Sequence, residues 1–501
     1  MWEICWFSQR MIVLRNIPSP HSNDPCPKIR NITMSIRNTG NVQDHVDALA
    51  DEAIALSDSV WAVPELCYDE VQSCALHRRM LLAHGFAITP DIAGISTALM
   101  GESGESGPVI AFLGEYDALP GLAAAAGSFV HTPTTLNGHG CGHNLLGAAS
   151  LLAALAVRDW LAVMQLPGRV RYYGCPAEEG GAGKGFMVRG GAFQGVDAAI
   201  SWHPSPFCGV LPPSSLANVR MDFTFTGRAA HAAAAPHLGR SALDAVELMS
   251  VGVNYLREHM LPTSRIHYAY INAGGMAPNV VQAETTVRYS VRAEDLSEML
   301  TLAERVKQVA QGAALMSGTQ VQSVITSGVA NLLPCPPLEE VIQASFEQLG
   351  PPPFDAEDRA FAEKIQETLS AEDIASALRQ IGRHTCDAPL ADFILPVGSR
   401  FSLGSTDVGD VSWTVPTVQA LGATCAIGTP LHSWQMTAQG TSDVAHKGMV
   451  HVAKAMAMTA IRLFQSPDLL KAAQDDHTQR LLRTPYICPI PESTLSPQGS
   501  C

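Results

Sequence analysis

The sequence is poor in charge and in aromatic side chains. Of its 501 residues, 16% are Asp, Glu, Lys or Arg and 6% are Phe, Trp or Tyr. Lys and Arg number 32 against 47 Asp and Glu, which leaves a net charge of −15 at pH 7. Proteins that bind nucleic acid carry a basic stripe or patch, and none stands out, so nucleic acid is not an expected partner. The 47% of hydrophobic residues are typical of a well-cored enzyme.

Cysteine pairs and long apolar runs are also missing. The twelve cysteines form no CxxC pair, and a chain of this length needs no disulfide framework, so reduced thiols and a cytoplasmic location are expected. No apolar run approaches the ~18–20 residues of a membrane span. The first residues also lack the charged region and apolar core of a signal peptide. The sequence therefore predicts no contact with a membrane.

The two ends of the chain differ from the rest in composition. Residues 16–33 are rich in Pro, Asn and Ser, so residues 1–33 are predicted to form a disordered extension. No apolar periodicity follows residue 475, and residues 471–501 are predicted to form a flexible tail.

Apolar strands and amphipathic helices alternate between the two ends, which predicts an α/β fold. From residue 219 the order becomes β-α-β-β-α-β, as in a ferredoxin-like module. We therefore expect an inserted lid and dimerisation domain at 216–331, between the parts 34–215 and 332–470 of an α/β/α catalytic domain. The expected strands are 94–100, 109–114, 170–174, 196–202, 219–225, 265–272, 284–292 and 319–326. The expected helices are 42–65, 68–85, 145–162, 241–260, 295–316, 337–349, 357–380 and 441–464.

Polar residues follow three of the predicted strands, 109–114, 170–174 and 196–202. The carboxyl ends of neighbouring strands in open α/β sheets are where functional sites form. We therefore expect one site to contain the residues that follow these strands, which are Asp117, Glu178, Glu179 and His203.

A glycine-rich segment, 137–147, carries three more potential metal ligands directly before a long apolar helix. Five consecutive residues of this segment, 139–143, include His139, Cys141 and His143. His432 lies in a second segment rich in Gly and Pro. Thiolate, imidazole and carboxylate groups suit zinc, and manganese where oxygen ligands contribute. A metal lowers the pKa of its bound water to ~7, and a neighbouring carboxylate can take the proton that this water releases.

Each of these residues also has a simpler interpretation. A histidine such as His203 or His432 is more often packed or exposed without a function, and two adjacent glutamates are usually a solvated acidic pair. Cys141 is also a candidate nucleophile with His143 as its base, as in thiol hydrolases. The joint pattern favours the metal.

Five motifs resemble those of the metal-dependent amidohydrolases and aminoacylases of the M20 peptidase superfamily. They are Cys-Gly-His-Asn at 141–144, Pro-Ala-Glu-Glu-Gly at 176–180, Gly-Arg-Ala-Ala-His-Ala at 227–232, Asn-Val-Val at 279–281 and Gly-Thr-Pro-Leu-His-Ser at 428–433. The resemblance covers about residues 40–470. The stretches 114–121, 405–413 and 432–440 are similar to a branch that cleaves p-aminobenzoyl-glutamate into p-aminobenzoate and glutamate, which is the activity we expect.

The resemblance implies a site for two divalent metal ions, manganese or zinc. Its ligands would be Cys141, His143, Glu179, His203 and His432. Cys141 would bridge the two ions. His139 matches no ligand of the superfamily, and Glu115 stands where other branches have a histidine.

The resemblance also assigns roles around the metals. Glu178 would act as general acid and base, and Asp117 would orient a ligand. His231 would reach into a partner subunit's site and polarise the scissile carbonyl. Asn279 and Arg292 would contact the carboxylate of a small amide substrate.

Other functions remain open. Relatives of this branch act on dipeptides with a basic residue, such as β-alanyl-lysine, or on N-acyl amino acids. The chain is alternatively an accessory subunit, since the enzyme it resembles has A-type and B-type subunits. A homodimer and a heterodimer with an A-type subunit are both expected forms.

Arg288, on the same strand face as Arg292, is interpreted as a solvated residue.

Overall fold

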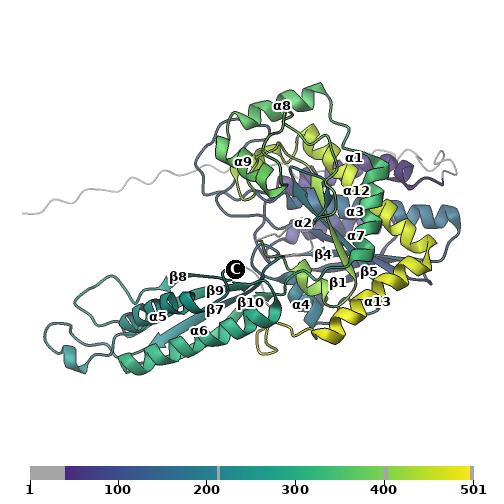
Figure 1. The fold of residues 1–501 in the computed structure, drawn as a ribbon. Helices are drawn as coiled ribbons and strands as arrows, with labels where there is room; N and C mark the ends of the chain where they lie inside the picture. Colours follow the sequence, from purple (N-terminus) through teal and green to yellow (C-terminus); the bar gives the residue numbers. More distant parts are fainter. Residues whose placement is uncertain (1–39, 212–214, 399–403, 497–501) are drawn as a thin grey trace, which may run out of the picture. The chain divides into compact units, whose positions relative to one another are not determined.

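A mixed seven-stranded sheet is the centre of the catalytic part of the protein. The computed structural model describes residues 40–211, 215–398 and 404–496, so the predicted extension 1–33 lies outside the described residues. The sheet has the order β1-β2-β4-β3-β5-β11-β6 (Figure 1). Its strands are β1 (Ala87–Pro90), β2 (Leu99–Ser103), β3 (Val109–Glu115), β4 (Arg169–Cys175), β5 (Ala198–Ser205), β6 (Gly209–Val210) and β11 (Thr417–Ala423).

The four central strands β4, β3, β5 and β11 run parallel, and the remaining strands extend the sheet antiparallel at its edges. Every residue of β3 is buried, as expected for a parallel strand covered on both faces. Successive side chains of a strand point to opposite faces. Ile110 and Phe112 accordingly belong to one hydrophobic core, and Ala111 and Leu113 to another.

Helices cover both faces of this sheet. One face packs against α1 (Val42–Trp61), α3 (His143–Met164) and α12 (Asp443–Gln465), and the other against α4 (Gly183–Arg189) and α10 (Val408–Ser412). The remaining helices of the catalytic part are α2 (Val71–Ala83), α7 (Pro336–Leu349), α8 (Ala356–Gln366), α9 (Ala371–Gln380), α11 (Trp434–Gln439) and α13 (Pro467–Arg483). Short 3₁₀ helices occur at Ile92–Gly94, Pro236–Leu238 and Arg257–His259.

Helix α3 contributes much of the first core. By length and composition alone, this 22-residue helix would suit a membrane span, with a mean hydropathy of 1.6 in its most apolar window. This result differs from the expectation that no segment is long and apolar enough to span a membrane. However, 78% of that window is buried inside the protein, and the core helix of a soluble protein passes the same test.

The inserted segment forms a separate four-stranded antiparallel sheet in the order β10-β7-β9-β8. Its elements are β7 (Ala217–Thr226), α5 (Ala242–Leu256), β8 (Arg265–Asn272), β9 (Glu284–Ala293), α6 (Leu296–Ser317) and β10 (Gln320–Val329). Val219, Met221 and Phe223 point into a core shared with α5 and α6, which cover one face (Figure 1). Arg220 and Asp222 alternate with them, so polar side chains line the other face.

Several expectations about secondary structure were wrong. The predicted strand 94–100 begins only at Leu99, as β2. The predicted helix 357–380 is two helices, because Ser370 caps α9 in a reciprocal capping box with Asp373. The predicted tail is helical up to Arg483 in α13, whose Leu470 and Ala473 pack into the first core. Strand β11 was not expected at all, although it pairs with β5 along its whole length.

Candidate metal centre

The carboxyl edge of the parallel sheet gathers most of the predicted site residues. β3 ends at Glu115 and leads into Asp117, and β4 leads into Glu178 and Glu179. His203 lies on β5 itself. The start of α3 brings Cys141 and His143 to the same edge, and His432 comes from the loop before α11.

Two sets of potential metal ligands share one thiol. Ligand atoms of Cys141, His143 and His203 all lie within 4.8 Å of one another, and so do those of Cys141, Glu179 and His432. The Sγ atom of Cys141 is 3.4 Å from Nε2 of His203, and Nε2 of His432 is 3.2 Å from Oε2 of Glu179. Two triads that meet at one sulfur fit a pair of ions with a bridging thiolate.

Unsatisfied buried atoms support this fit. Nε2 of His143 and Oε1 of Glu179 are buried and have no hydrogen-bond partner among the described residues. A buried polar atom without a partner costs about 1–3 kcal/mol. Coordination of a metal ion would satisfy both atoms, and both belong to the ligand sets.

The nitrogen atoms that point away from the centre are held by acceptors. Nδ1 of His143 lies 2.8 Å from Oδ1 of Asp117, and Nδ1 of His203 lies 2.8 Å from the carbonyl oxygen of Pro204. An acceptor at Nδ1 places the proton there and leaves the Nε2 lone pair free for a metal. Burial alone would raise the pKa of Asp117, but its contacts with His143 hold that pKa below its ordinary value.

Glu178 lies beside these ligands. It shares a third group of ligand atoms within 4.8 Å with Glu115 and His143. Burial, followed by the negative charges of Glu115 and Asp407, raises the pKa of Glu178 well above its ordinary value. A carboxyl group with a raised pKa in such a site is suited to hold a proton during the reaction.

The structure adds a buried cation that the sequence interpretation missed. Nζ of Lys184 lies 2.6 Å from Oε1 of Glu115 and 2.6 Å from Oδ1 of Asp407, and all three residues are buried. The backbone N–H of Lys184 also donates to Oδ2 of Asp407 at 2.8 Å. This network holds the carboxylate of Glu115 in position, and Oε2 of that carboxylate is 3.4 Å from Nε2 of His143. Its signal in the sequence was one lysine at a glycine-rich helix start, which did not stand out.

Two predicted residues lie far from the ligands within one chain. His231 and Asn279 are exposed and adjacent, with the N–H of Ala232 donating to the carbonyl oxygen of Asn279 at 3.0 Å. Asn279 precedes the first residue of β9, Glu284, whereas Arg292 lies near the last residue of that strand. Arg292 donates to Oγ of Ser405 at 3.0 Å. Eight residues of strand separate Glu284 from Arg292, which corresponds to ~26 Å.

The contacts of the His231 ring make its Nε2 atom a hydrogen-bond donor. Its Nδ1 accepts from the N–H groups of Ala233 and Ala234, at 3.2 and 3.1 Å. Nε2 must therefore carry the proton in the neutral ring. A donor pointing outward suits the polarisation of a carbonyl in another molecule, not one at this chain's own metal centre.

The structure argues against His139 as a metal ligand and against Cys141 as a nucleophile. His139 is buried outside both ligand sets, with Nε2 3.1 Å from the carbonyl oxygen of Val60. Burial and the negative charge of Glu179 raise the pKa of Cys141 well above its ordinary value. A nucleophilic cysteine needs a lowered pKa, so without a metal this thiol is poorly suited to attack a substrate.

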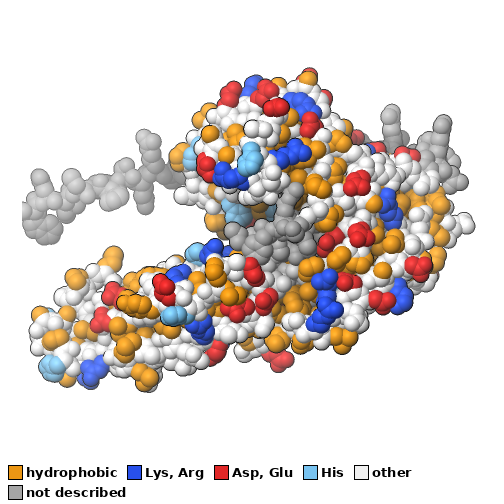
Figure 2. All heavy atoms as spheres, in the orientation of Figure 1, with side chains coloured by type: hydrophobic (Ala, Val, Ile, Leu, Met, Phe, Trp, Pro, Cys, Tyr) orange, Lys and Arg blue, Asp and Glu red, His pale blue; other side chains and the backbone are white. Residues whose placement is uncertain are grey.

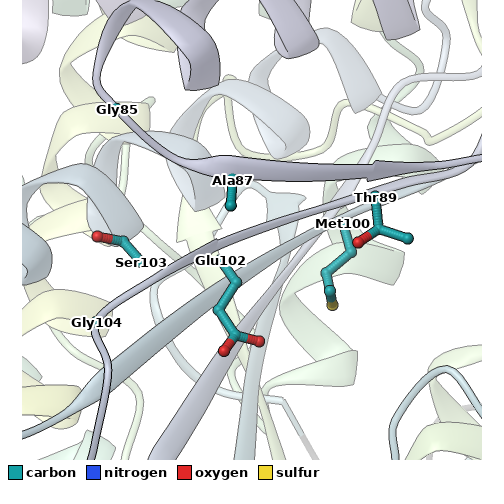
Figure 3. Close-up of a pocket in the computed structure, with 7 residues that line it drawn as sticks. All are labelled: Gly85, Ala87, Thr89, Met100, Glu102, Ser103 and Gly104. Carbon is teal, nitrogen blue, oxygen red and sulfur yellow. The ribbon is translucent and has the colours of Figure 1, made fainter.

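A pocket at the far edge of the sheet carries none of this chemistry. It is lined by Gly85, Ala87, Thr89, Met100, Glu102, Ser103 and Gly104 on β1, β2 and the adjoining turns (Figure 3). Its one carboxylate, Glu102, is paired with Arg169 and Arg171.

Comparison with known proteins identifies the family. A model of the peptidase family M20/M25/M40 matches residues 111–424. The chain is 43% identical over 473 residues to the B-type subunit of the p-aminobenzoyl-glutamate hydrolase of Escherichia coli (strain K12), covering 91% of this chain and 98% of that protein. It is 30% identical over 468 residues to the Xaa-Arg dipeptidase of Homo sapiens, covering 88% and 92%.

Solved structures agree in fold. A putative aminohydrolase from methicillin-resistant Staphylococcus aureus superposes with a TM-score of 0.59 at 16% identity, over 84% of this chain and 98% of that one. An aminobenzoyl-glutamate utilization protein from Klebsiella pneumoniae gives 0.55 at 16% identity, over 83% and 98%. The chain belongs to the peptidase family M20/M25/M40. It is a metal-dependent amide hydrolase of that family, and the expected family and α/β fold are confirmed.

Proposed function

We propose that this protein hydrolyses the amide bond of p-aminobenzoyl-glutamate and releases p-aminobenzoate and glutamate. The observation that carries the proposal is the pair of ligand sets sharing Cys141, with Glu178 beside them, in a chain 43% identical to the B-type subunit of a p-aminobenzoyl-glutamate hydrolase. The ligands proposed for two manganese or zinc ions are Cys141, His143, Glu179, His203 and His432. The proposed location is the cytoplasm.

The protein's own residues would divide the remaining work. When bound, the metal ions supply a nucleophile from water at neutral pH and polarise the carbonyl group. Glu178 takes the proton of the attacking water and passes it to the amide nitrogen as the C–N bond breaks. Asp117 keeps His143 in the tautomer that binds metal, and Arg292 binds a carboxylate of the substrate.

We further propose that the active form is a dimer, with His231 and Asn279 supplied by the partner subunit. Support comes from their separation from the metal ligands along the inserted sheet, and from the exposed Nε2 donor of His231. The outer surface of α5 and the edge strand β8 also expose several large apolar side chains, and Figure 2 shows hydrophobic residues over this domain. They are Leu248, Val251, Tyr255, Tyr268, Tyr270 and Ile271. The partner is a second copy or a related A-type subunit.

A second candidate is hydrolysis of dipeptides with a basic residue, which the likeness to an Xaa-Arg dipeptidase favours. The two are separated by assaying release of p-aminobenzoate from p-aminobenzoyl-glutamate against cleavage of β-alanyl-lysine. The same preparation also tests the accessory-subunit alternative, because an accessory subunit would show neither activity alone.

The decisive test uses the full chain after chelation, reloaded with Mn²⁺ or Zn²⁺. We expect Glu178→Gln to bind the same amount of metal while kcat falls by roughly 10²- to 10⁴-fold, as for loss of a general acid–base group. Near-normal turnover of Glu178→Gln would contradict the role given to Glu178. Wild-type protein that holds metal and leaves p-aminobenzoyl-glutamate intact would contradict the proposed substrate.

A further inference from the structure

Two arginines lie together where the polar face of the inserted sheet meets the metal-binding loops. Asn218 of β7 is paired with Arg292 of β9, so Arg220, two residues along on the same face, is a diagonal neighbour of Arg292. Diagonal neighbours across an antiparallel pair are ~7–8 Å apart, within reach of long side chains. The two guanidinium groups can therefore serve one ligand.

Arg220 contacts the loop that carries the proposed proton carrier. Its Nη1 donates to the carbonyl oxygen of Gly180 at 3.1 Å, and Gly180 directly follows Glu178 and Glu179. Gly180 has a φ of +122°, and a Cβ atom there would lie 2.7 Å from Nη2 of Arg220. Glycine at this position thus serves both the backbone conformation and the approach of the guanidinium group to the site.

Among the residues that the structure describes, neither guanidinium group has an anionic partner. Among the ion pairs of the described residues, none within 4.0 Å involves Arg220 or Arg292. By contrast, Arg288 on the same face is paired with Asp222, with Nε 2.7 Å from Oδ1. Arg292 is half-buried, and burial together with the positive charge of Arg220 lowers its pKa. Two neighbouring cations without a counter-ion are costly unless a ligand supplies the negative charge.

We propose that Arg220 and Arg292 form a dicarboxylate subsite for the leaving group, in which Arg220 selects an acidic side chain. Arg292 binds one carboxylate of the glutamate moiety and Arg220 binds the other. A planar guanidinium group matches a carboxylate with two parallel hydrogen bonds. The subsite rests on the proposed function and deepens it, because a lysine or neutral residue in the leaving group would leave Arg220 without a partner.

The test compares p-aminobenzoyl-glutamate with p-aminobenzoyl-glutamine, which has nearly the same shape and lacks the side-chain charge. Arg220→Gln removes the positive charge and keeps a polar side chain at this position. We expect kcat/KM for the glutamate compound to fall roughly 10- to 100-fold, the effect of losing a charged hydrogen-bond pair. Activity on the glutamine compound should change little. Arg288→Gln, on the same strand face, is the matched control and should leave the ratio unchanged.

A second readout separates this subsite from the proposed reaction. L-glutamate should raise the thermal unfolding midpoint of the metal-loaded wild type more than L-glutamine does, and Arg220→Gln should remove the difference. If the wild type leaves p-aminobenzoyl-glutamate intact but shows this difference, the proposed function fails and the subsite stands. Arg220→Lys, which keeps the charge, should retain the preference for glutamate.

Three outcomes would overturn the subsite. In the first, the wild type responds equally to glutamate and glutamine in both measurements. In the second, Arg220→Gln lowers both activities by the same factor, which would mean that Arg220 only ties β7 to Gly180. Loss of the preference in Arg220→Lys to the same extent as in Arg220→Gln would also exclude selection by charge.

Discussion

Asp117 holds the ring of His143 through a single short contact, with Oδ1 2.8 Å from Nδ1. Its other oxygen, Oδ2, accepts the backbone N–H of Glu179 at 2.9 Å. One buried carboxylate therefore fixes a proposed ligand of each metal set, and a change at Asp117 should affect both sets.

Replacing Asp117 by Asn should weaken metal binding. An amide can offer its NH₂ group to Nδ1, which would favour the tautomer that has its proton on the metal-facing nitrogen. Loss of such a supporting carboxylate typically costs about 10- to 100-fold in metal affinity. Titration of the stripped protein with Zn²⁺, followed by metal analysis, measures this change. Equal affinities in Asp117→Asn and the wild type would contradict the orienting role.

Replacing Lys184 by Met should destabilise the fold. The change leaves Glu115 and Asp407 buried beside each other without the cation that both contact at 2.6 Å. Breaking a buried pair by removing one partner costs about 3–5 kcal/mol. A matched control is Lys471→Met, whose exposed pair with Asp475 in α13 should be worth less than ~1 kcal/mol. Chemical denaturation of both variants gives the comparison, and similar midpoints would refute it.

Mixing two inactive variants should restore activity if His231 acts in the partner subunit. Glu178→Gln and His231→Ala each damage every site of their own homodimer. A mixed dimer keeps one intact site, so random exchange should recover about one quarter of wild-type activity. Recovery is measured after co-refolding or co-expression with two different tags. No recovery despite isolation of the mixed dimer would contradict a site shared between copies.

Replacing Asp410 by Asn should flatten the dependence of stability on pH. Burial raises the pKa of Asp410 from 3.8 to about 7, although Tyr486 donates to it at 2.7 Å. Between these values the folded state binds the proton and the unfolded state does not, so the contribution of Asp410 to stability falls as pH rises from about 4 to 7. Thermal unfolding of both proteins across this range, taken as a difference, checks the sign. A difference that grows in favour of the wild type with rising pH would contradict it.

Local patterns were sufficient where the burial of an element follows a regular pattern along its own residues. The period-two alternation of residues 219–225 predicted β7, and the apolar run 109–114 predicted β3, because burial on one or both faces leaves a direct trace in the residue order. β11 was missed because Gln419 and Gly422 interrupt its apolar run, although the strand is buried between β5 and β6. α13 was missed because its buried residues are only Leu470, Ala473 and His477, which leaves a weak apolar pattern in a polar helix.

The sequence by itself determined the chemistry of this protein. Its ligand types, the paired glutamates and the glycine-rich helix start are properties of neighbouring residues. They were sufficient to predict the family, which is confirmed, and the five ligands, which stay a proposal. Only the tertiary structure decided which side chains meet across long sequence separations. It placed Lys184 between Glu115 and Asp407, set Arg220 beside Gly180, and separated His231 and Asn279 from the metal ligands. Contacts of this kind depend on sheet order and strand register, and no local pattern records them.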